Sequence, residues 1–275
     1  MKLTVAAAQL ALRDGDEPAN LAAARLACEE AAARKADLLV LPELWLSGYD
    51  LEHASELALA PGDSRWDAIA TLARDHDLAV AGSLLVREGD GVRNALVIFD
   101  RSGLLVARYD KLHLFPPGGE VQHLAPGQAI QVASLGPGSS RAGAVEGLGL
   151  AICYDLRFPE LFRAMRGRGA TLVLLPAQWP HSRLAHWSLL VRARAVENQV
   201  FLVAANRTGR DGAIRYAGHS VILDPWGEPM VEVGDPPAVL SATLDLDAVA
   251  QVRARFPVWG DRRADLFGEG RGGLG

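Results

Sequence analysis

Three side chains that can transfer protons or form covalent bonds each follow an apolar, strand-like stretch of the chain. They are Glu43, Lys111 and Cys153, and the stretches before them are residues 38–41, 104–109 and 148–152. If these strands share a sheet, their ends bring an acid, a cation and a thiol to one edge. Such a set favours nucleophilic catalysis, because the carboxylate can take the thiol proton while the ammonium stabilises an oxyanion.

Cys153 lies between an apolar strand and a segment that enters a helix at Pro159. In that position the backbone N–H of Tyr154 can point at a developing oxyanion, and a nearby helix start favours a thiolate. The alternative is a small core residue, because free cysteines are often buried for packing alone. Cys28, among the alanines of a predicted helix, is expected to be such a core residue.

The acid and the lysine also have ordinary alternatives. Glu43 follows Pro42 at a strand end, where burial would raise its pKa toward a value useful for proton transfer. Taken alone, Glu43 would better fit an acid in a solvated loop or at the start of a helix. Lys111 alone would be an ordinary surface lysine, so only the three residues together indicate catalysis.

Composition excludes several classes of protein. The net charge of -5 and the absence of a long basic block argue against a nucleic-acid or anionic-membrane surface. Two cysteines give no disulfide framework, and no apolar run approaches the roughly 18 residues of a membrane helix. The apolar start of the chain is interrupted by Gln9, which favours a buried strand over a signal peptide. We therefore expect a soluble, cytoplasmic protein.

Strand-like and helix-like stretches alternate along the chain. Strands are predicted at residues 3–8, 37–41, 78–85, 94–99, 104–109, 130–133, 141–145, 148–153, 171–175, 200–205, 220–224 and 238–244. Helices are predicted at residues 20–35, 64–75 and 186–197 and from residue 159 onward. This mixture of hairpins and crossovers predicts two mixed sheets packed together with helices outside, an α/β fold. We expect one domain over residues 1–267 and a flexible Gly-rich tail over residues 268–275.

A series of motifs resembles the nitrilase superfamily of carbon–nitrogen hydrolases. The motifs occur in the order typical of that family and cover nearly the whole chain up to residue 267. They are Leu41-Pro42-Glu43-Leu44, Tyr109-Asp110-Lys111-Leu112-His113-Leu114-Phe115, Cys153-Tyr154-Asp155-Leu156-Arg157-Phe158-Pro159-Glu160, Ala185-His186-Trp187, residues 192–199, Gly218-His219-Ser220 and Asp224-Pro225-Trp226-Gly227.

The resemblance implies a four-layer αββα sandwich that assembles as a homodimer or a higher homo-oligomer. It implies a catalytic triad of Glu43, Lys111 and Cys153, with Glu120 as a second active-site carboxylate that positions Lys111 or assists the water. The Tyr154 N–H would help to stabilise the oxyanion, and the chemistry would require neither a metal nor an organic cofactor. The separation of Glu120 from Lys111 is shorter than in some relatives.

Within the superfamily, the chain is most similar to the omega-amidases, which hydrolyse 2-oxoglutaramate and 2-oxosuccinamate. Residues 153–160, 186–199 and 253–265 carry this likeness, and Ala177-Gln178-Trp179-Pro180 resembles the bacterial form. A deaminated-glutathione amidase, a carbamoylase and an aliphatic amidase remain alternatives with the same triad. The reaction in every case would be hydrolysis of a small-molecule amide through a cysteine thioester.

The omega-amidase substrates carry a carboxylate that needs a cationic partner. Arg157, just beyond Cys153, either pairs with that carboxylate or braces a carboxylate of the protein. Phe115 and Trp179 either line the pocket or belong to the core. His186 is expected to be a structural hydrogen-bonding residue, and Glu197 is expected to pair with a nearby arginine or backbone group.

Two functions of other classes can be weighed against amide hydrolysis. A metal-dependent phosphoesterase with its own αββα sandwich would use Glu43, Asn206, Asp224 and His219, but these residues form no compact ligand motif and leave Cys153 without a role. A catalytically silent scaffold of this fold would be signalled by loss of the glutamate, the lysine or the cysteine, and all three are present.

Overall fold

The computed structural model describes residues 1–263 and 265–266, and within these residues the strands form two six-stranded mixed sheets and one two-stranded ribbon. The first sheet, ordered β14-β1-β2-β3-β4-β5, contains β1 (Lys2–Gln9), β2 (Leu38–Val40), β3 (Ala79–Glu88), β4 (Gly91–Phe99), β5 (Leu105–Asp110) and β14 (Ala238–Asp245). The second sheet, ordered β13-β12-β9-β8-β7-β6, contains β6 (Val132–Leu135), β7 (Val145–Leu150), β8 (Leu172–Ala177), β9 (Phe201–Asn206), β12 (Val221–Leu223) and β13 (Pro229–Glu232). The ribbon pairs β10 (Arg210–Asp211) with β11 (Ile214–Arg215).

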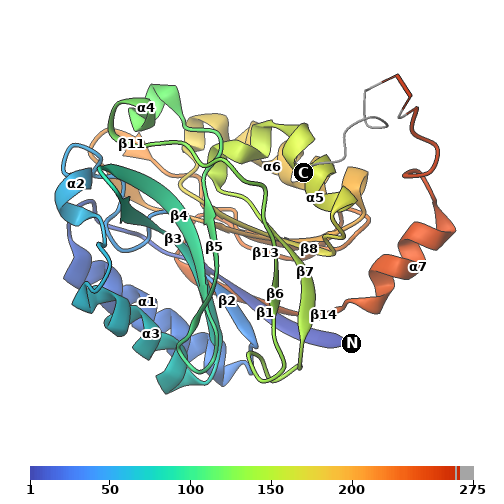
Figure 1. Ribbon diagram of the computed structural model, residues 1–275, viewed down its shortest axis with the longest axis horizontal. Helices are drawn as coiled ribbons and strands as arrows, with labels where there is room; N and C mark the ends of the chain where they lie inside the picture. Colours follow the sequence, from blue (N-terminus) through green and yellow to red (C-terminus); the bar gives the residue numbers. More distant parts are fainter. Residues whose placement is uncertain (264, 267–275) are drawn as a thin grey trace.

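Helices cover the outer face of each sheet. In Figure 1, α1 (Glu17–Ala33) and α3 (Ser64–His76) lie against the first sheet, and α5 (Pro159–Gly167) and α6 (Leu184–Asn198) lie against the second. The shorter helical segments are α2 (Ala54–Leu57), η1 (Pro116–Gly118), α4 (Glu120–His123), η2 (Cys153–Arg157), η3 (His181–Arg183) and, near the C-terminus, α7 (Asp247–Arg255). The predicted four-layer αββα arrangement is confirmed.

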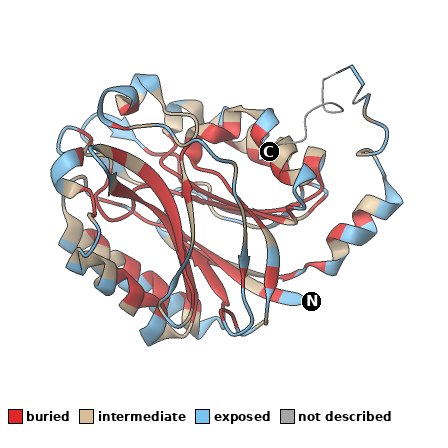
Figure 2. Cartoon of the chain, in the orientation of Figure 1, coloured by how far each residue is buried: buried red, intermediate tan, exposed pale blue. Residues whose placement is uncertain are grey.

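Successive side chains of β1 point to opposite faces of the first sheet and pack into two different cores. Leu3, Val5 and Ala7 point into the core between the sheets, while Ala6 and Ala8 point into the core shared with α1 and α3. The central strands of both sheets are mostly buried (Figure 2).

Cys28 lies in α1 and is fully buried in the core between this helix and the first sheet. Burial raises the pKa of its thiol to about 12. The prediction that Cys28 is a core residue is confirmed.

Strand direction brings several loops to one edge of the sandwich. β1, β2 and β3 are parallel in the first sheet, and β7, β8 and β9 are parallel in the second. Parallel neighbours end on the same side, so the segments that follow β2, β7 and β8 can form one site.

The separate strand predicted at residues 141–145 is wrong, because residues 141–144 lie in turns and irregular backbone. The strand predicted at residues 148–153 is present as β7, but it begins and ends three residues earlier. Gly143 has a φ of +95°, which L side chains rarely adopt and which breaks an extended strand. Cys153 consequently does not end a strand, but begins the 3-10 turn η2.

Several elements were not predicted from the sequence. They include β13, the ribbon β10–β11 and α7, whose buried face consists of only Val249 and Val252. The first helix also begins earlier than predicted, because Asp16 accepts a hydrogen bond from the Ala19 N–H and so caps it. The stretch predicted to be a flexible tail, residues 268–275, lies outside the described residues.

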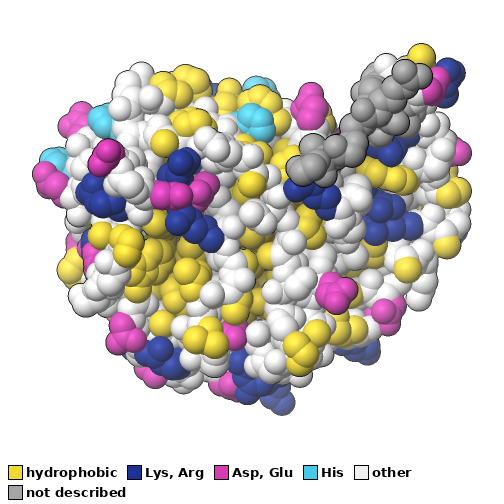
Figure 3. Space-filling view, viewed as in Figure 1, with side chains coloured by type: hydrophobic (Ala, Val, Ile, Leu, Met, Phe, Trp, Pro, Cys, Tyr) yellow, Lys and Arg dark blue, Asp and Glu magenta, His cyan; other side chains and the backbone are white. Residues whose placement is uncertain are grey.

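The surface visible in Figure 3 carries basic and acidic side chains interspersed with apolar ones. No helix within the described residues is both long and apolar enough to span a membrane.

Candidate active site

A buried cluster of charged side chains joins two of the predicted catalytic residues to Glu120. The ammonium Nζ of Lys111 lies 2.7 Å from Oε1 of Glu43 and 2.7 Å from Oε1 of Glu120. The side chains are 1% exposed for Lys111 and 0% exposed for both glutamates. Asn94 on β4 donates from Nδ2 to Glu43 Oε1 at 2.8 Å and to Glu120 Oε1 at 3.5 Å. The cluster is therefore almost completely removed from solvent.

Glu43 is fixed by the segments that follow β2 and β8. The backbone N–H of Gln178 donates to Glu43 Oε2 at 3.0 Å, and the Gln178 side-chain amide donates to the Glu43 carbonyl at 2.7 Å. The next residue, Leu44, has a φ of +44° and donates its N–H to the Ser83 hydroxyl. Tight turns of this kind cost conformational energy, which the surrounding hydrogen bonds offset.

The backbone of Lys111 is held from two sides just past the end of β5. Its N–H donates to the Asn94 carbonyl at 2.9 Å, and its carbonyl accepts from the Gly127 N–H at 2.8 Å. A Cβ at Gly127 would lie 2.1 Å from the Asp110 carbonyl oxygen, so only glycine allows this approach. Glu120, at the start of α4, accepts the Phe115 N–H at 2.6 Å on its second oxygen.

Cys153 begins η2 with a φ of +43° and is 9% exposed. A residue other than glycine rarely adopts this conformation, and such strain is concentrated at functional sites. The turn places Cys153 at the same cavity as Gln178 in the segment after β8.

Asp155, two residues after Cys153, ties the cysteine turn to the lysine segment. Its carboxylate is fully buried and accepts the Tyr109 hydroxyl at 2.7 Å, the His113 N–H at 3.1 Å and the Ile152 N–H at 2.9 Å. The imidazole of His113 stacks on Phe158 with ring centroids 3.7 Å apart. Asp155 was not predicted to be a site residue, although it belongs to the motif that contains Cys153.

Burial and mutual charge set the protonation of the cluster. Burial, reinforced by the Glu120 charge, raises the pKa of Glu43 even though Lys111 acts in the opposite direction. Burial alone would lower the pKa of Lys111, but the charges of Glu120 and Glu43 outweigh this and raise it, so the lysine stays an ammonium.

Burial and the Glu43 charge raise the pKa of Cys153 well above its ordinary value, despite the opposing effect of Lys111. The expectation that a helix start would favour the thiolate is therefore wrong for this environment. Because desolvation and the neighbouring carboxylate raise this pKa, attack by the sulfur requires a base that removes the proton.

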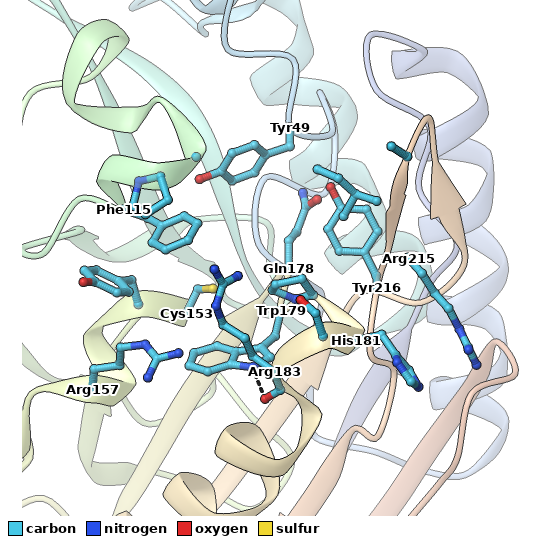
Figure 4. A pocket seen from close by; sticks show the side chains of 17 residues that line it. Tyr49, Phe115, Cys153, Arg157, Gln178, Trp179, His181, Arg183, Arg215 and Tyr216 are labelled. Atoms are coloured by element: carbon cyan, nitrogen blue, oxygen red, sulfur yellow. Dashed lines mark hydrogen bonds between the residues drawn. The ribbon is translucent and has the colours of Figure 1, made fainter.

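Cys153 opens into a cavity of about 500 Å³. The cavity is lined by the predicted pocket residues Phe115, Arg157 and Trp179, and by Tyr154, whose N–H was predicted to stabilise the oxyanion. Tyr49, Gln178 and Arg183 also line it but were not predicted (Figure 4). The pKa of Tyr49 is raised by burial and by the Glu120 and Glu43 charges, which keeps its hydroxyl protonated beside the cluster. The structure thus brings every predicted site residue to the charged cluster or to the cavity.

Gln178 and its support could not be recognised from sequence spacing. The fully buried Arg207 donates to Gln178 Oε1 at 2.7 Å and to Asp14 at 2.6 Å, which fixes the orientation of the Gln178 amide. Residue 178 is 135 positions from Glu43 in the sequence, and only the pairing of the sheets brings the two together.

Arg157 does not brace a carboxylate of the described chain, since no ion pair joins it to an acidic side chain there. Its guanidinium lies 4.7 Å from the Trp179 ring centroid, and Nη2 lies 3.5 Å from Nδ1 of His186. Glu197 pairs with Arg194 at 2.9 Å, as predicted.

The groups of the phosphoesterase alternative do not assemble into a ligand set. Glu43 is bound to Lys111, Asn206 accepts the Trp179 N–H, and Asp224 accepts the Trp226 and Glu228 N–H groups. Within residues 1–263 and 265–266, no group of three or more His, Cys, Asp or Glu side chains is arranged to hold a metal ion.

The family model and the similar proteins agree on one family. Residues 4–254 match the family model described as carbon-nitrogen hydrolase. A 2-oxoglutaramate amidase from Bacillus subtilis is 39% identical over 268 residues, which cover 97% of this chain and 100% of that protein.

Two solved structures share the fold over nearly the whole chain. XC1258 from Xanthomonas campestris, a CN-hydrolase superfamily protein with an arsenic adduct in its active site, has a TM-score of 0.85 and 32% identity and covers 95% of this chain and 97% of its own. The amidase from Nesterenkonia sp. AN1, in a mutant form with acrylamide added to its active-site cysteine, has a TM-score of 0.81 and 31% identity, with coverage of 97% and 99%.

Replacement of the buried ammonium tests the electrostatics of the cluster. Lys111→Met leaves two carboxylates without their cation and should lower the free energy of unfolding by about 3–5 kcal/mol at neutral pH. Without Lys111 the folded-state pKa of Glu43 rises further above its unfolded value, so the variant should regain stability as the pH falls toward that unfolded value. Urea unfolding between pH 8 and pH 5 measures both effects.

Lys2→Met, which removes an exposed ammonium, is the control and should unfold like the wild type. Addition of Glu120→Gln to Lys111→Met should restore part of the loss. A deficit for Lys111→Met that does not change with pH would contradict the electrostatic explanation.

Proposed function

The chain belongs to the carbon–nitrogen hydrolase family, and on this premise we propose that it is an amidase that cleaves a small linear amide through a thioester on Cys153. The observation that carries the proposal is the buried cluster of Glu43, Lys111 and Glu120, which adjoins a protonated thiol at a cavity. A base, a fixed cation and a nucleophile are the groups that this reaction requires.

In the first half of the reaction, Glu43 takes the proton of Cys153 as the sulfur attacks the amide carbon. The raised pKa of both groups supports a direct transfer, since neither charge is stabilised by water. The ammonium of Lys111 and the Tyr154 N–H stabilise the tetrahedral oxyanion. Glu43 then returns the proton to the leaving nitrogen, the carbon–nitrogen bond breaks, and ammonia departs from the thioester.

In the second half, Glu43 removes a proton from water, and the hydroxide attacks the thioester carbon. Collapse of the second tetrahedral intermediate releases the carboxylic acid and returns the proton to the sulfur. Glu120 positions Lys111 throughout, because an ammonium has three donors and the two carboxylates occupy two of them. The third donor can point at the oxyanion.

The substrate class we favour is the ω-amide of a short 2-oxo dicarboxylic acid, namely 2-oxoglutaramate or 2-oxosuccinamate. The relative from Bacillus subtilis that is named 2-oxoglutaramate amidase supports this choice. In this proposal Arg157 pairs with the substrate carboxylate, while Phe115 and Trp179 form the walls of the pocket.

We further propose a single catalytic domain over residues 1–267 that acts in the cytoplasm as a homodimer or a higher homo-oligomer. The proposed chemistry uses only side chains and backbone groups of the chain, without a metal or an organic cofactor.

Ammonia release from a panel of amides tests the proposal. The panel comprises 2-oxoglutaramate, 2-oxosuccinamate, deaminated glutathione, a carbamoyl amino acid and a simple aliphatic amide. We expect the highest kcat/KM for 2-oxoglutaramate or 2-oxosuccinamate. Cys153→Ala should abolish release, and Cys153→Ser should be nearly inactive because a hydroxyl is much less acidic than a thiol.

Cys28→Ala, which changes only a core cysteine, is the matched control and should keep the activity of the wild type. Turnover by Cys153→Ala at the wild-type rate would refute the mechanism. Loss of activity with a chelator, without inhibition by iodoacetamide, would instead favour a metal enzyme.

The acid limb of the pH profile tests the role of Glu43 as the base. Because Glu43 must be ionised and its pKa is raised, kcat/KM should fall at a pH above the ordinary range of a glutamate. Glu120→Gln removes a negative charge that raises this pKa. The acid limb of the kcat/KM profile should therefore move to a pH about one unit lower.

Glu228→Gln, which alters an exposed acid, should leave the limb in place. A limb that moves to higher pH in Glu120→Gln, or that does not move, would contradict the assignment of the base.

A further inference from the structure

Three arginines line the cavity around Cys153, and they differ in how their charge is balanced. Arg215 is exposed and pairs with Asp235. Arg157 and Arg183 are half-buried and form no ion pair with a carboxylate anywhere in the described part of the chain. Two uncompensated cations therefore lie beside the proposed nucleophile.

The surroundings of these two cations are aromatic. The guanidinium of Arg183 lies 5.7 Å from the Phe115 ring centroid, and that of Arg157 lies 4.7 Å from the Trp179 ring centroid. A partly desolvated guanidinium gains most from an anionic partner that accepts two parallel hydrogen bonds. A carboxylate on the ligand supplies such a partner.

Arg183 has fewer interactions within the protein than Arg157. The Arg157 side chain contacts His186 and stacks against Trp179, whereas Arg183 makes no side-chain hydrogen bond within the described residues. Its backbone, by contrast, is fixed: the carbonyl accepts Nε1 of Trp179 at 2.8 Å, and the N–H donates to Pro180 at 3.0 Å. A rigid backbone thus carries a side chain whose donors are available to a ligand.

The direction of the Arg183 side chain also makes its donors available to a ligand in the cavity. In Figure 4, Arg183 extends from η3 into the cavity toward Cys153 and Phe115, while His181 and Arg215 point away from Cys153. The segment that carries Arg183 directly follows Gln178, which binds Glu43. Residues 178–183 therefore contact the proposed base, Glu43, and also place Arg183 in the cavity.

We infer that Arg183 is a specificity-determining residue that binds the substrate carboxylate together with Arg157. The inference rests on the proposed function and extends it, because it assigns the recognition of the charged end of the substrate to η3. Lysine at this position would keep the charge but lose the planar pair of donors, so it would replace arginine only in part.

Paired substrates test the inference. The kcat/KM of the full-length enzyme is measured by ammonia release on 2-oxoglutaramate and on pentanamide, which lacks the carboxylate. Arg183→Gln should lower kcat/KM for 2-oxoglutaramate about 30-fold or more, mainly through KM, and change that for pentanamide by less than about threefold. Arg183→Lys should fall between Arg183→Gln and the wild type on 2-oxoglutaramate. Arg192→Gln is the control: it removes a half-buried arginine of α6 that pairs with Glu232 of β13, and it should match the wild type on both substrates.

Calorimetric titration with 2-oxoglutarate gives a measurement that does not depend on turnover. The Kd should rise about 30-fold or more in Arg183→Gln and remain unchanged in Arg192→Gln. Equal losses on both amides, or an unchanged Kd, would overturn the role of Arg183. If the wild type released no ammonia from 2-oxoglutaramate, the proposed function would fail, but the titration would still decide whether Arg183 binds a carboxylate.

Discussion

The rest of the site depends on the two buried ion pairs that the Lys111 ammonium makes with Glu43 and Glu120. A buried cation with two carboxylates is stable only if geometry and hydrogen bonds offset the loss of hydration. Asn94 and the Gln178 backbone supply those hydrogen bonds. Burial raises the pKa of Glu43, while the charges of Glu120 and Glu43 outweigh the effect of burial on Lys111 and keep the lysine charged. The contacts that stabilise the cluster therefore also set the protonation required for catalysis.

The fold serves mainly to hold that cluster against Cys153. The cluster takes one residue from beyond β2 and another from beyond β5 in the first sheet, while Cys153 follows β7 in the second. Asp155 connects the two sheets at this edge, because its buried carboxylate binds both Tyr109 and the turn of the cysteine. The positive φ of Cys153 costs conformational energy, and the hydrogen bonds of Asp155 offset this cost.

The sequence contained the three reactive residues in recognisable positions because each follows a strand-like stretch, a pattern that is local. The two-sheet architecture was predictable for the same reason. Residues such as Asn94, Gln178 and Arg183 were not, since their roles arise only when strands distant in the sequence pack together. The protonation of Cys153 was mispredicted because a helix start is visible in a sequence, whereas desolvation by folded neighbours is not. The false strand at residues 141–145 reflects a positive φ at Gly143 that no apolar pattern reveals.

In the proposed mechanism, the buried cluster enables Cys153 to form a covalent acyl intermediate. Rapid acid quenching during turnover of 2-oxoglutaramate, followed by peptide mass spectrometry, would detect this intermediate. The peptide containing Cys153 should gain the mass of the substrate acyl group, and hydroxylamine should remove this mass as a hydroxamate. Steady release of ammonia with no acyl group on Cys153, or with the acyl group on another residue, would contradict the mechanism.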